Sequence, residues 1–165
     1  MPTYLLPKHI AYSQSLASYV KDNLSDSTAQ ALTLGELCRL GAGDLTIGDI
    51  SATPLSYAPV QGDKRLRQEI AQFHQSLNCH NRALDADHVV TFSGAQEALS
   101  AIYQTVLRAG DEIVVLTPSY PSLVSMAESM GVVVREIALC TDNAWQVNIE
   151  AFKQVVNDHT RLIVL

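Results

Sequence analysis

The sequence predicts an α/β fold, a mostly parallel sheet with helices on both faces, preceded by an N-terminal helical and loop segment. From Val89 onward, short apolar runs alternate with segments of helical spacing in the order βαβαβαβ. The apolar runs are continuous rather than alternating, which is typical of parallel strands buried on both faces. The chain has 165 residues, 47% of them hydrophobic, and is therefore long enough for a domain with its own core.

The N-terminal part is expected to contain helices and loops. Residues up to about Ser25 are irregular or weakly helical. Thr33 and Glu36 have the spacing of a capping box, which predicts a helix over Leu34–Leu40 that stops at Gly41. Residues 41–59 are rich in Gly, Ser, Thr and Pro and are expected to form a loop.

A second helix is expected to begin after Asp63, a good N-cap residue. Its apolar residues recur at helical spacing and fall on one face: Leu66, Ile70, Phe73 and Leu77. A polar connector over residues 78–88 follows, in which Asp85 and Asp87 are typical turn formers.

The first strand and helix of the predicted sheet region lie over residues 89–92 and 96–109. Gly110 is expected to stop this helix at C′. The helix has an apolar stripe that we expect to be buried: Leu99, Ile102, Tyr103 and Val106.

Three further strands are expected, over residues 112–116, 132–137 and 162–165. Pro121 suits the first turn of a helix that ends before Gly131. Asn148 is the expected cap of a helix over residues 149–157. Because the last strand ends with the chain, we expect the sequence to be the N-terminal piece of a longer protein, since a strand cut there would leave backbone groups unpaired.

The turn between residues 92 and 96 is the strongest candidate site. Ser93, Gly94, Ala95 and Gln96 join a predicted strand to the start of a helix, where free backbone N–H groups and the helix dipole favour a phosphate. An ordinary strand-to-helix turn with a glycine bend would have the same sequence. No Walker-type or dinucleotide-binding glycine pattern is present.

Two tyrosines are candidates for contacts with the same ligand. Tyr120 follows the strand at residues 112–116, at the sheet edge where ligands bind in open α/β folds, and its ring could stack on a flat cofactor. A partly buried aromatic at the rim of the core is the alternative. Tyr57 lies in a loop beside Pro59, where simple packing against the proline would also explain it.

Composition and residue spacing exclude several classes of function. A net charge of −6 gives no basic surface for nucleic acid, and no apolar run approaches the ~20 residues of a membrane span. The histidines show no metal-ligand pattern, so no metal site is expected. Three scattered cysteines and the lack of a signal peptide favour reduced thiols in a cytoplasmic protein: Cys38, Cys79 and Cys140.

Taken together, these motifs resemble the fold-type I pyridoxal-phosphate enzymes, in particular the class I and II aminotransferases. The resemblance runs from about Tyr57 to Leu165. It rests on Tyr57-x-Pro59-x-x-Gly62, Leu66-Arg67-x-x-Ile70-Ala71, Ser93-Gly94-Ala95-Gln96-Glu97-Ala98-Leu99, Ala109-Gly110-Asp111-Glu112 and Pro118-x-Tyr120. It implies that residues 1–60 form an N-terminal arm and helical segment. Residues 61–165 would then form the first part of the cofactor-binding large domain, truncated in a strand.

The resemblance also implies roles for individual residues. Ser93, Gly94, Ala95 and Gln96 would hold the phosphate of pyridoxal 5′-phosphate, and Tyr120 would stack on its ring. Tyr57 would reach the phosphate in the other subunit of a homodimer.

The remaining cofactor and substrate residues are expected downstream of Leu165, including the catalytic lysine that forms the Schiff base. Arg67 matches a structural position, expected in a salt bridge. The lysines of this chain lie in none of the matching motifs: Lys8, Lys21, Lys64 and Lys153.

The implied activity is amino-group transfer between an amino acid and a 2-oxo acid, with this chain alone inactive. A lyase, decarboxylase or cyclase could use the same scaffold, because substrate orientation is decided largely downstream. A stand-alone module that binds a phosphate ligand, or a catalytically inactive relative acting as an interaction partner, are further alternatives.

Overall fold

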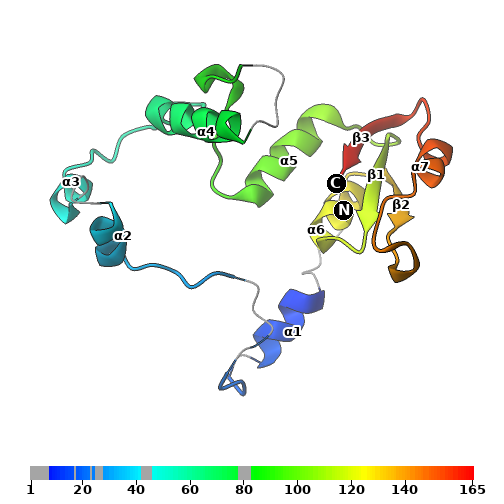
Figure 1. Ribbon diagram of the computed structural model, residues 1–165, viewed down its shortest axis with the longest axis horizontal. Coiled ribbons are helices and arrows are strands. Elements are labelled where there is room, and N and C mark those ends of the chain that lie inside the picture. The colour runs from blue at the N-terminus through cyan, green and yellow to red at the C-terminus, as the bar shows by residue number, and fades with distance from the viewer. Residues whose placement is uncertain (1–7, 17, 23, 25–27, 42–45, 78–82) are drawn as a thin grey trace. The chain divides into compact units, whose positions relative to one another are not determined.

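The computed structural model describes residues 8–16, 18–22, 24, 28–41, 46–77 and 83–165. The chain forms two compact units, one made of Met1–Leu16 with Thr91–Leu165 and the other of Ala17–Val90. The first unit carries the sheet (Figure 1). The domain boundary expected between residues 60 and 61 stays a prediction.

A three-stranded parallel sheet forms the centre of the first unit. Strand β1 (Glu112–Thr117) lies between β2 (Val133–Ala138) and β3 (Thr160–Val164). The connection from β1 to β2 and the connection from β2 to β3 cross the sheet in opposite directions. Right-handed connections therefore place their helices on opposite faces of the sheet. Figure 1 shows α6 (Pro121–Ser129) on one side of the strands and α7 (Ile149–Val155) on the other. The predicted parallel α/β architecture is thus confirmed.

The core lies where β1 meets the helices that flank it in sequence. Ile113 and Val115 are fully buried and point to one face of the strand, as residues two apart do. They pack with four other buried residues: Tyr103, Leu107, Ala127 and Val132. Since β1 has neighbours on both sides, its middle residues have no exposed surface, which explains the continuous apolar run in the sequence.

Two helices of this unit begin where the sequence predicts, whereas α1 (Lys8–Leu16) forms in a stretch expected to be irregular or weakly helical. Pro121 occupies the first turn of α6, which ends before Gly131, and the Asn148 side chain caps α7 by accepting the Ala151 N–H at 3.1 Å. Helix α7 ends at Val155, two residues before the predicted end. A short 3₁₀ turn over Thr141–Asn143, which the sequence reading did not predict, follows β2.

The strand predicted over residues 89–92 is absent, and this prediction was wrong. These residues take no regular structure, and Val90 and Phe92 are 49% and 42% exposed. A strand exists only as part of a hydrogen-bonded ladder, and none of the three strands in the described chain pairs with this segment. Apolar sequence alone was insufficient to place it in the sheet.

Helix α5 (Ala95–Val106) ends three residues earlier than predicted. Leu107 leaves the helix in an extended conformation and turns into the core, while the Arg108 guanidinium donates to the Leu107 carbonyl at 2.8 Å. Gly110 therefore does not lie at C′. It adopts a φ of +91° in a turn, where its N–H donates to the Gly131 carbonyl at 2.9 Å.

The predicted buried stripe of α5 is wrong apart from Tyr103. Ile102 and Val106 are 44% and 45% exposed, and Leu99 is half-buried. The helix contacts its unit through Tyr103 and through Leu107 just beyond its end. Helical periodicity predicted an apolar face on this helix, but Tyr103 is the residue of that face that is buried in the structure.

The described residues of the second unit include three α-helices and the segment that follows them. Helix α2 (Leu34–Leu40) has the predicted bounds and capping box, with the Thr33 N–H donating to Glu36 at 2.8 Å. The loop predicted over residues 41–59 contains a short helix, α3 (Ile47–Ser51), so that prediction was partly wrong. Thr46 and Asp49 form a second capping box there, with the same spacing in the sequence as Thr33 and Glu36.

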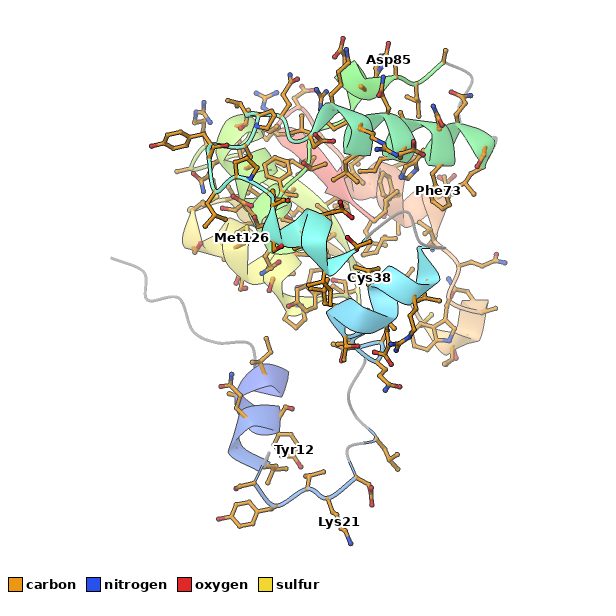
Figure 2. All side chains as sticks on the ribbon, turned by 90° about the vertical axis from the view of Figure 1, so that its left-hand side faces the viewer. Tyr12, Lys21, Cys38, Phe73, Asp85 and Met126 are labelled. Carbon is orange, nitrogen blue, oxygen red and sulfur yellow. The ribbon has the colours of Figure 1, made fainter. Side chains whose placement is uncertain are left out.

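Helix α4 (Lys64–Ser76) begins after Asp63, whose side chain accepts the Leu66 N–H at 2.9 Å, as predicted. Its apolar face, however, is exposed: Leu66, Phe73 and Leu77 keep half or more of their surface. The buried residues are Arg67 and Ala71, which face the 3₁₀ turn η1 (Ala86–His88). Figure 2 shows Asp85 on one side of α4 and Phe73 on the other.

Arg67 has the structural role that the sequence predicted. Its guanidinium donates to the carbonyls of Gly62 and Ala86 and lies 3.8 Å from the Asp87 carboxylate. The side chain is almost wholly buried, yet its donors meet two backbone acceptors and a charge, which offsets the cost of removing it from water. Arg67 thus ties the start of α4 to η1.

No helix among the described residues is long and apolar enough to cross a membrane. Cys38 and Cys140 form no disulfide, and Cys79 lies outside the described residues together with the rest of 78–82.

Candidate functional site

The predicted phosphate-binding turn forms the entry to α5. Gly94 is the N-cap, with φ +98° and ψ 162°, a backbone conformation that is essentially restricted to glycine. A Cβ built at Gly94 would have no neighbour within 4 Å. Glycine is therefore required by the conformation rather than by crowding, and the space beside the turn is open to a ligand.

The first turn of α5 presents several unused backbone donors. The earliest bond within the helix is the 3.4 Å contact from the Ala98 N–H to the Gly94 carbonyl, so the three preceding N–H groups have no acceptor in the helix. The helix dipole adds about half a positive charge at this end. Ser93, Ala95 and Gln96 are all exposed. These features fit a phosphate group.

Glu97 is a part of this turn to which the sequence reading gave no role. Its carboxylate accepts the Ser93 N–H at 2.6 Å, while the Gly94 N–H donates to the Phe92 carbonyl at 2.8 Å. Glu97 is the third residue of the helix, the position from which a glutamate reaches back in a capping box. A glutamate at the third helical position, four residues after Ser93, was the sequence signal that could have predicted this contact.

Tyr120 lies at the carboxyl end of β1, where the sequence placed it. It is the N-cap of α6 and is 45% exposed. Figure 1 shows α5 running antiparallel to β1, so the start of α5 and the end of β1 lie at the same end of this unit. The turn at Ser93–Gln96 begins α5 and Tyr120 follows β1, so both belong to this edge of the unit, although the strand expected before Ser93 does not form.

Tyr103 connects the two helices that carry these residues. It is 1% exposed, and its hydroxyl donates to the Leu123 carbonyl in the first turn of α6 at 3.0 Å. Burial raises the pKa of this phenol, so it remains a neutral donor across the physiological range. The bond fixes α6, and with it the backbone of Tyr120, against α5.

Tyr57 belongs to the other unit, Ala17–Val90, and its side chain is fully exposed. It lines a shallow hollow together with Leu55 and Ser56. Its predicted role across a dimer interface stays a prediction.

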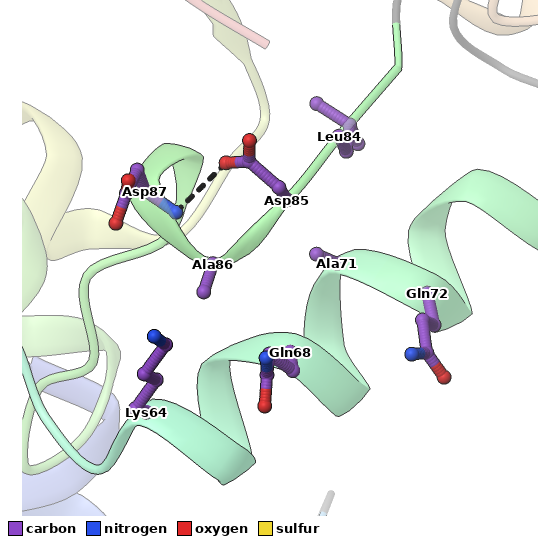
Figure 3. Close-up of a pocket in the computed structure, with 8 residues that line it drawn as sticks. All are labelled: Lys64, Gln68, Ala71, Gln72, Leu84, Asp85, Ala86 and Asp87. Atoms are coloured by element: carbon purple, nitrogen blue, oxygen red, sulfur yellow. Dashed lines mark hydrogen bonds between the residues drawn. The ribbon is translucent and has the colours of Figure 1, made fainter.

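A separate groove of about 320 Å³ lies between α4 and the segment before and within η1 (Figure 3). Its lining is mainly polar and includes Lys64, Asp85 and Asp87, with the Asp87 N–H donating to the Asp85 carboxylate at 2.9 Å. None of the predicted site residues line it. Within the described part of the chain, no three His, Cys, Asp or Glu side chains gather in a way that could hold a metal ion.

The turn at Ser93 and Tyr120 both lie in a stretch of sequence that is similar to known proteins. The family model for aminotransferase class I and II matches residues 49–165, which include the turn at Ser93 and Tyr120. The chain belongs to the class I and II aminotransferases. The cofactor that this family implies is pyridoxal 5′-phosphate, as the sequence resemblance predicted.

Individual relatives agree with this assignment. The chain is 33% identical over 119 residues to the arginine–pyruvate transaminase AruH of Pseudomonas aeruginosa, covering 72% of this chain and 30% of that protein. It is 31% identical over 145 residues to the capreomycidine synthase of Streptomyces vinaceus, covering 88% of this chain and 36% of the relative.

A solved structure supports the fold. YbdL from Escherichia coli, described as having a methionine aminotransferase function, matches with a TM-score of 0.75 and 27% identity over 99% of this chain and 42% of its own. This aminotransferase chain thus spans about a third of the length of the curated relatives that it matches.

Proposed function

We propose that this chain supplies the phosphate anchor and the ring platform of a pyridoxal-phosphate-dependent aminotransferase that moves an amino group between an amino acid and a 2-oxo acid. The open turn at Gly94 is the observation that carries the proposal, because it lies within the family match and has the unused donors that a phosphate needs. When bound, the cofactor supplies the electron sink for chemistry at the amino acid.

Each residue at the edge has a separate task in this proposal. The N–H groups of Ala95 and Gln96 and the Ser93 hydroxyl donate to the phosphate, and the Gly94 backbone approaches it closely. Tyr120 covers one face of the ring and excludes water from it. Tyr57 completes the phosphate contacts of a second subunit in a homodimer, and the protein is cytoplasmic.

The ring platform is tested by titration with pyridoxamine 5′-phosphate, which lacks the aldehyde and does not form Schiff bases with surface lysines. Tyr120→Ala is expected to weaken binding about tenfold, since aromatic contacts of this kind are worth about 0.5–1.5 kcal/mol beyond the area they bury. Tyr120→Phe keeps the ring and is expected to bind like the wild type. Equal affinity of all three proteins would remove Tyr120 from the site.

A second function, a cyclase or other synthase on the same scaffold, is favoured by the similarity to capreomycidine synthase over most of the chain. The two functions are distinguished by supplying the full gene product with amino acids and a 2-oxo acid. Appearance of a new amino acid from the 2-oxo acid supports transfer, whereas its absence together with conversion of the amino acid supports the second function.

A further inference from the structure

The two backbone donors immediately before α5 are already used within the turn. The Ser93 N–H donates to the Glu97 carboxylate at 2.6 Å, and the Gly94 N–H donates to the Phe92 carbonyl at 2.8 Å. The donors left for a phosphate are therefore those of the first helical turn and the Ser93 hydroxyl. Glu97 does not compete for these helical donors, because its carboxylate is folded back onto the residue before the N-cap.

Two effects of Glu97 on an anion oppose each other. Its negative charge belongs to the same first turn of α5 as the Ala95 and Gln96 N–H groups proposed to bind the phosphate, and it would repel the anion. Its hydrogen bond holds Ser93, which is followed by a glycine with few conformational restrictions of its own. The side chain is exposed, so water and salt screen the repulsion, whereas the cost of ordering a loose turn on binding is not screened.

We propose that Glu97 is a positioning residue, which holds the Ser93–Gly94 turn in its phosphate-binding shape by accepting the Ser93 N–H. The inference rests on the proposed function of this edge as a phosphate anchor. Reach and hydrogen-bond acceptance at position 97 matter for binding, and the negative charge does not. A glutamate combines two properties, a hydrogen-bond acceptor of sufficient reach and a negative charge.

Three substitutions separate these properties. Glu97→Gln keeps an acceptor oxygen at the same reach without the charge, Glu97→Asp keeps the charge with a shorter reach, and Glu97→Ala has neither. Glu128→Ala, which removes an exposed glutamate from α6, is the matched control. Thermal unfolding of each full 165-residue variant is measured alongside, so that loss of binding is separated from loss of folding.

Affinity for pyridoxamine 5′-phosphate is the first readout. We expect Glu97→Asp and Glu97→Ala to bind about tenfold more weakly, and Glu97→Gln and the control to bind as tightly as the wild type or more tightly. Pyridoxamine, which has no phosphate, is expected to bind all five proteins equally. The amide signal of Ser93 in a ¹⁵N–¹H spectrum is the second readout, and it is expected to move in the aspartate and alanine variants alone.

If Glu97→Asp binds pyridoxamine 5′-phosphate like the wild type and Glu97→Gln binds it as weakly as Glu97→Ala, the negative charge at position 97 matters for binding. That result would overturn the proposal. Unchanged affinity in Glu97→Ala would overturn it as well. If the wild type binds neither ligand, the proposed phosphate anchor itself fails, an outcome distinct from the other two. If Glu97→Ala does not fold, the comparison of glutamine with aspartate still decides the question.

Discussion

Ser122 is a buried polar residue for which the described part of the chain offers no hydrogen-bond partner. It lies in the first turn of α6 with 1% of its surface exposed, and its hydroxyl oxygen is unpaired, as is that of Ser125 one turn on. Ser129, on the same helix, instead donates to the Met126 carbonyl at 2.7 Å. A buried hydroxyl without a partner loses its bonds to water and gains nothing in return.

Replacing Ser122 by alanine is therefore expected to raise the free energy of unfolding by about 1 kcal/mol, because an unsatisfied polar group is removed at almost constant shape. Ser129→Ala, which removes a satisfied hydroxyl, is the control and is expected to give no gain. Urea unfolding of the three proteins measures both changes. Destabilisation by Ser122→Ala would mean that the hydroxyl has a partner in the folded protein.

At the scale of elements, one carboxylate links the amino ends of all three strands. Glu112 on β1 accepts two bonds from the Arg135 guanidinium on β2, at 2.7 and 3.0 Å, and one from the Asn157 amide before β3, at 2.9 Å. The irregularity in the β1–β3 pairing falls beside it, between Glu112 and Ile113. The network therefore holds the strands together at the edge opposite the proposed cofactor site.

The same contacts determine a pH dependence. The bonds from Arg135, and then that from Asn157, lower the pKa of Glu112 from 4.5 to about 2. Stability due to a lowered pKa is fully present above the unfolded value and is lost as the pH falls through the folded one. The melting temperature of the wild type is thus expected to fall between pH 4.5 and pH 2 more steeply than that of Glu112→Gln.

Glu136→Gln, which changes an exposed glutamate on β2, is the control for this measurement. Its melting curve is expected to follow the wild type at each pH. Parallel wild-type and Glu112→Gln curves across the acid range would show that the network contributes no pH-dependent stability.

For the whole molecule, we expect the proposed site to have an anchor and a platform but no catalytic base from this chain. The four lysines of the chain lie outside the motifs that the resemblance assigns to the cofactor: Lys8, Lys21, Lys64 and Lys153. A lysine that forms a Schiff base must lie within bonding distance of the cofactor aldehyde. We therefore expect this 165-residue chain to anchor the cofactor without catalysing the reaction.

The purified 165-residue chain is accordingly expected to bind pyridoxamine 5′-phosphate but to show no transamination. Formation of a 2-oxo acid from an amino acid is the measurement, with a complete class I aminotransferase as the positive control. Turnover by the purified chain would contradict the proposal and would direct attention to its four lysines.

The sequence by itself determined the features that depend on neighbouring residues. The capping box at Thr33, the caps at Asp63 and Asn148, the start of α6 at Pro121 and the glycine turn at Gly94 are local, because each depends on contacts within a few residues. Continuous apolar runs also placed the three strands that form, since strands buried on both faces need them.

Tertiary structure decided what depends on partners distant in the sequence. Residues 89–92 have the composition of a strand but no ladder to join, and the apolar face of α4 stays exposed while Arg67 is buried. The packing of Tyr103 against α6, through its bond to the Leu123 carbonyl, required the folded chain to be seen. A residue pattern specifies which face is apolar, whereas only the three-dimensional arrangement specifies which surface meets it, because burial belongs to pairs of surfaces.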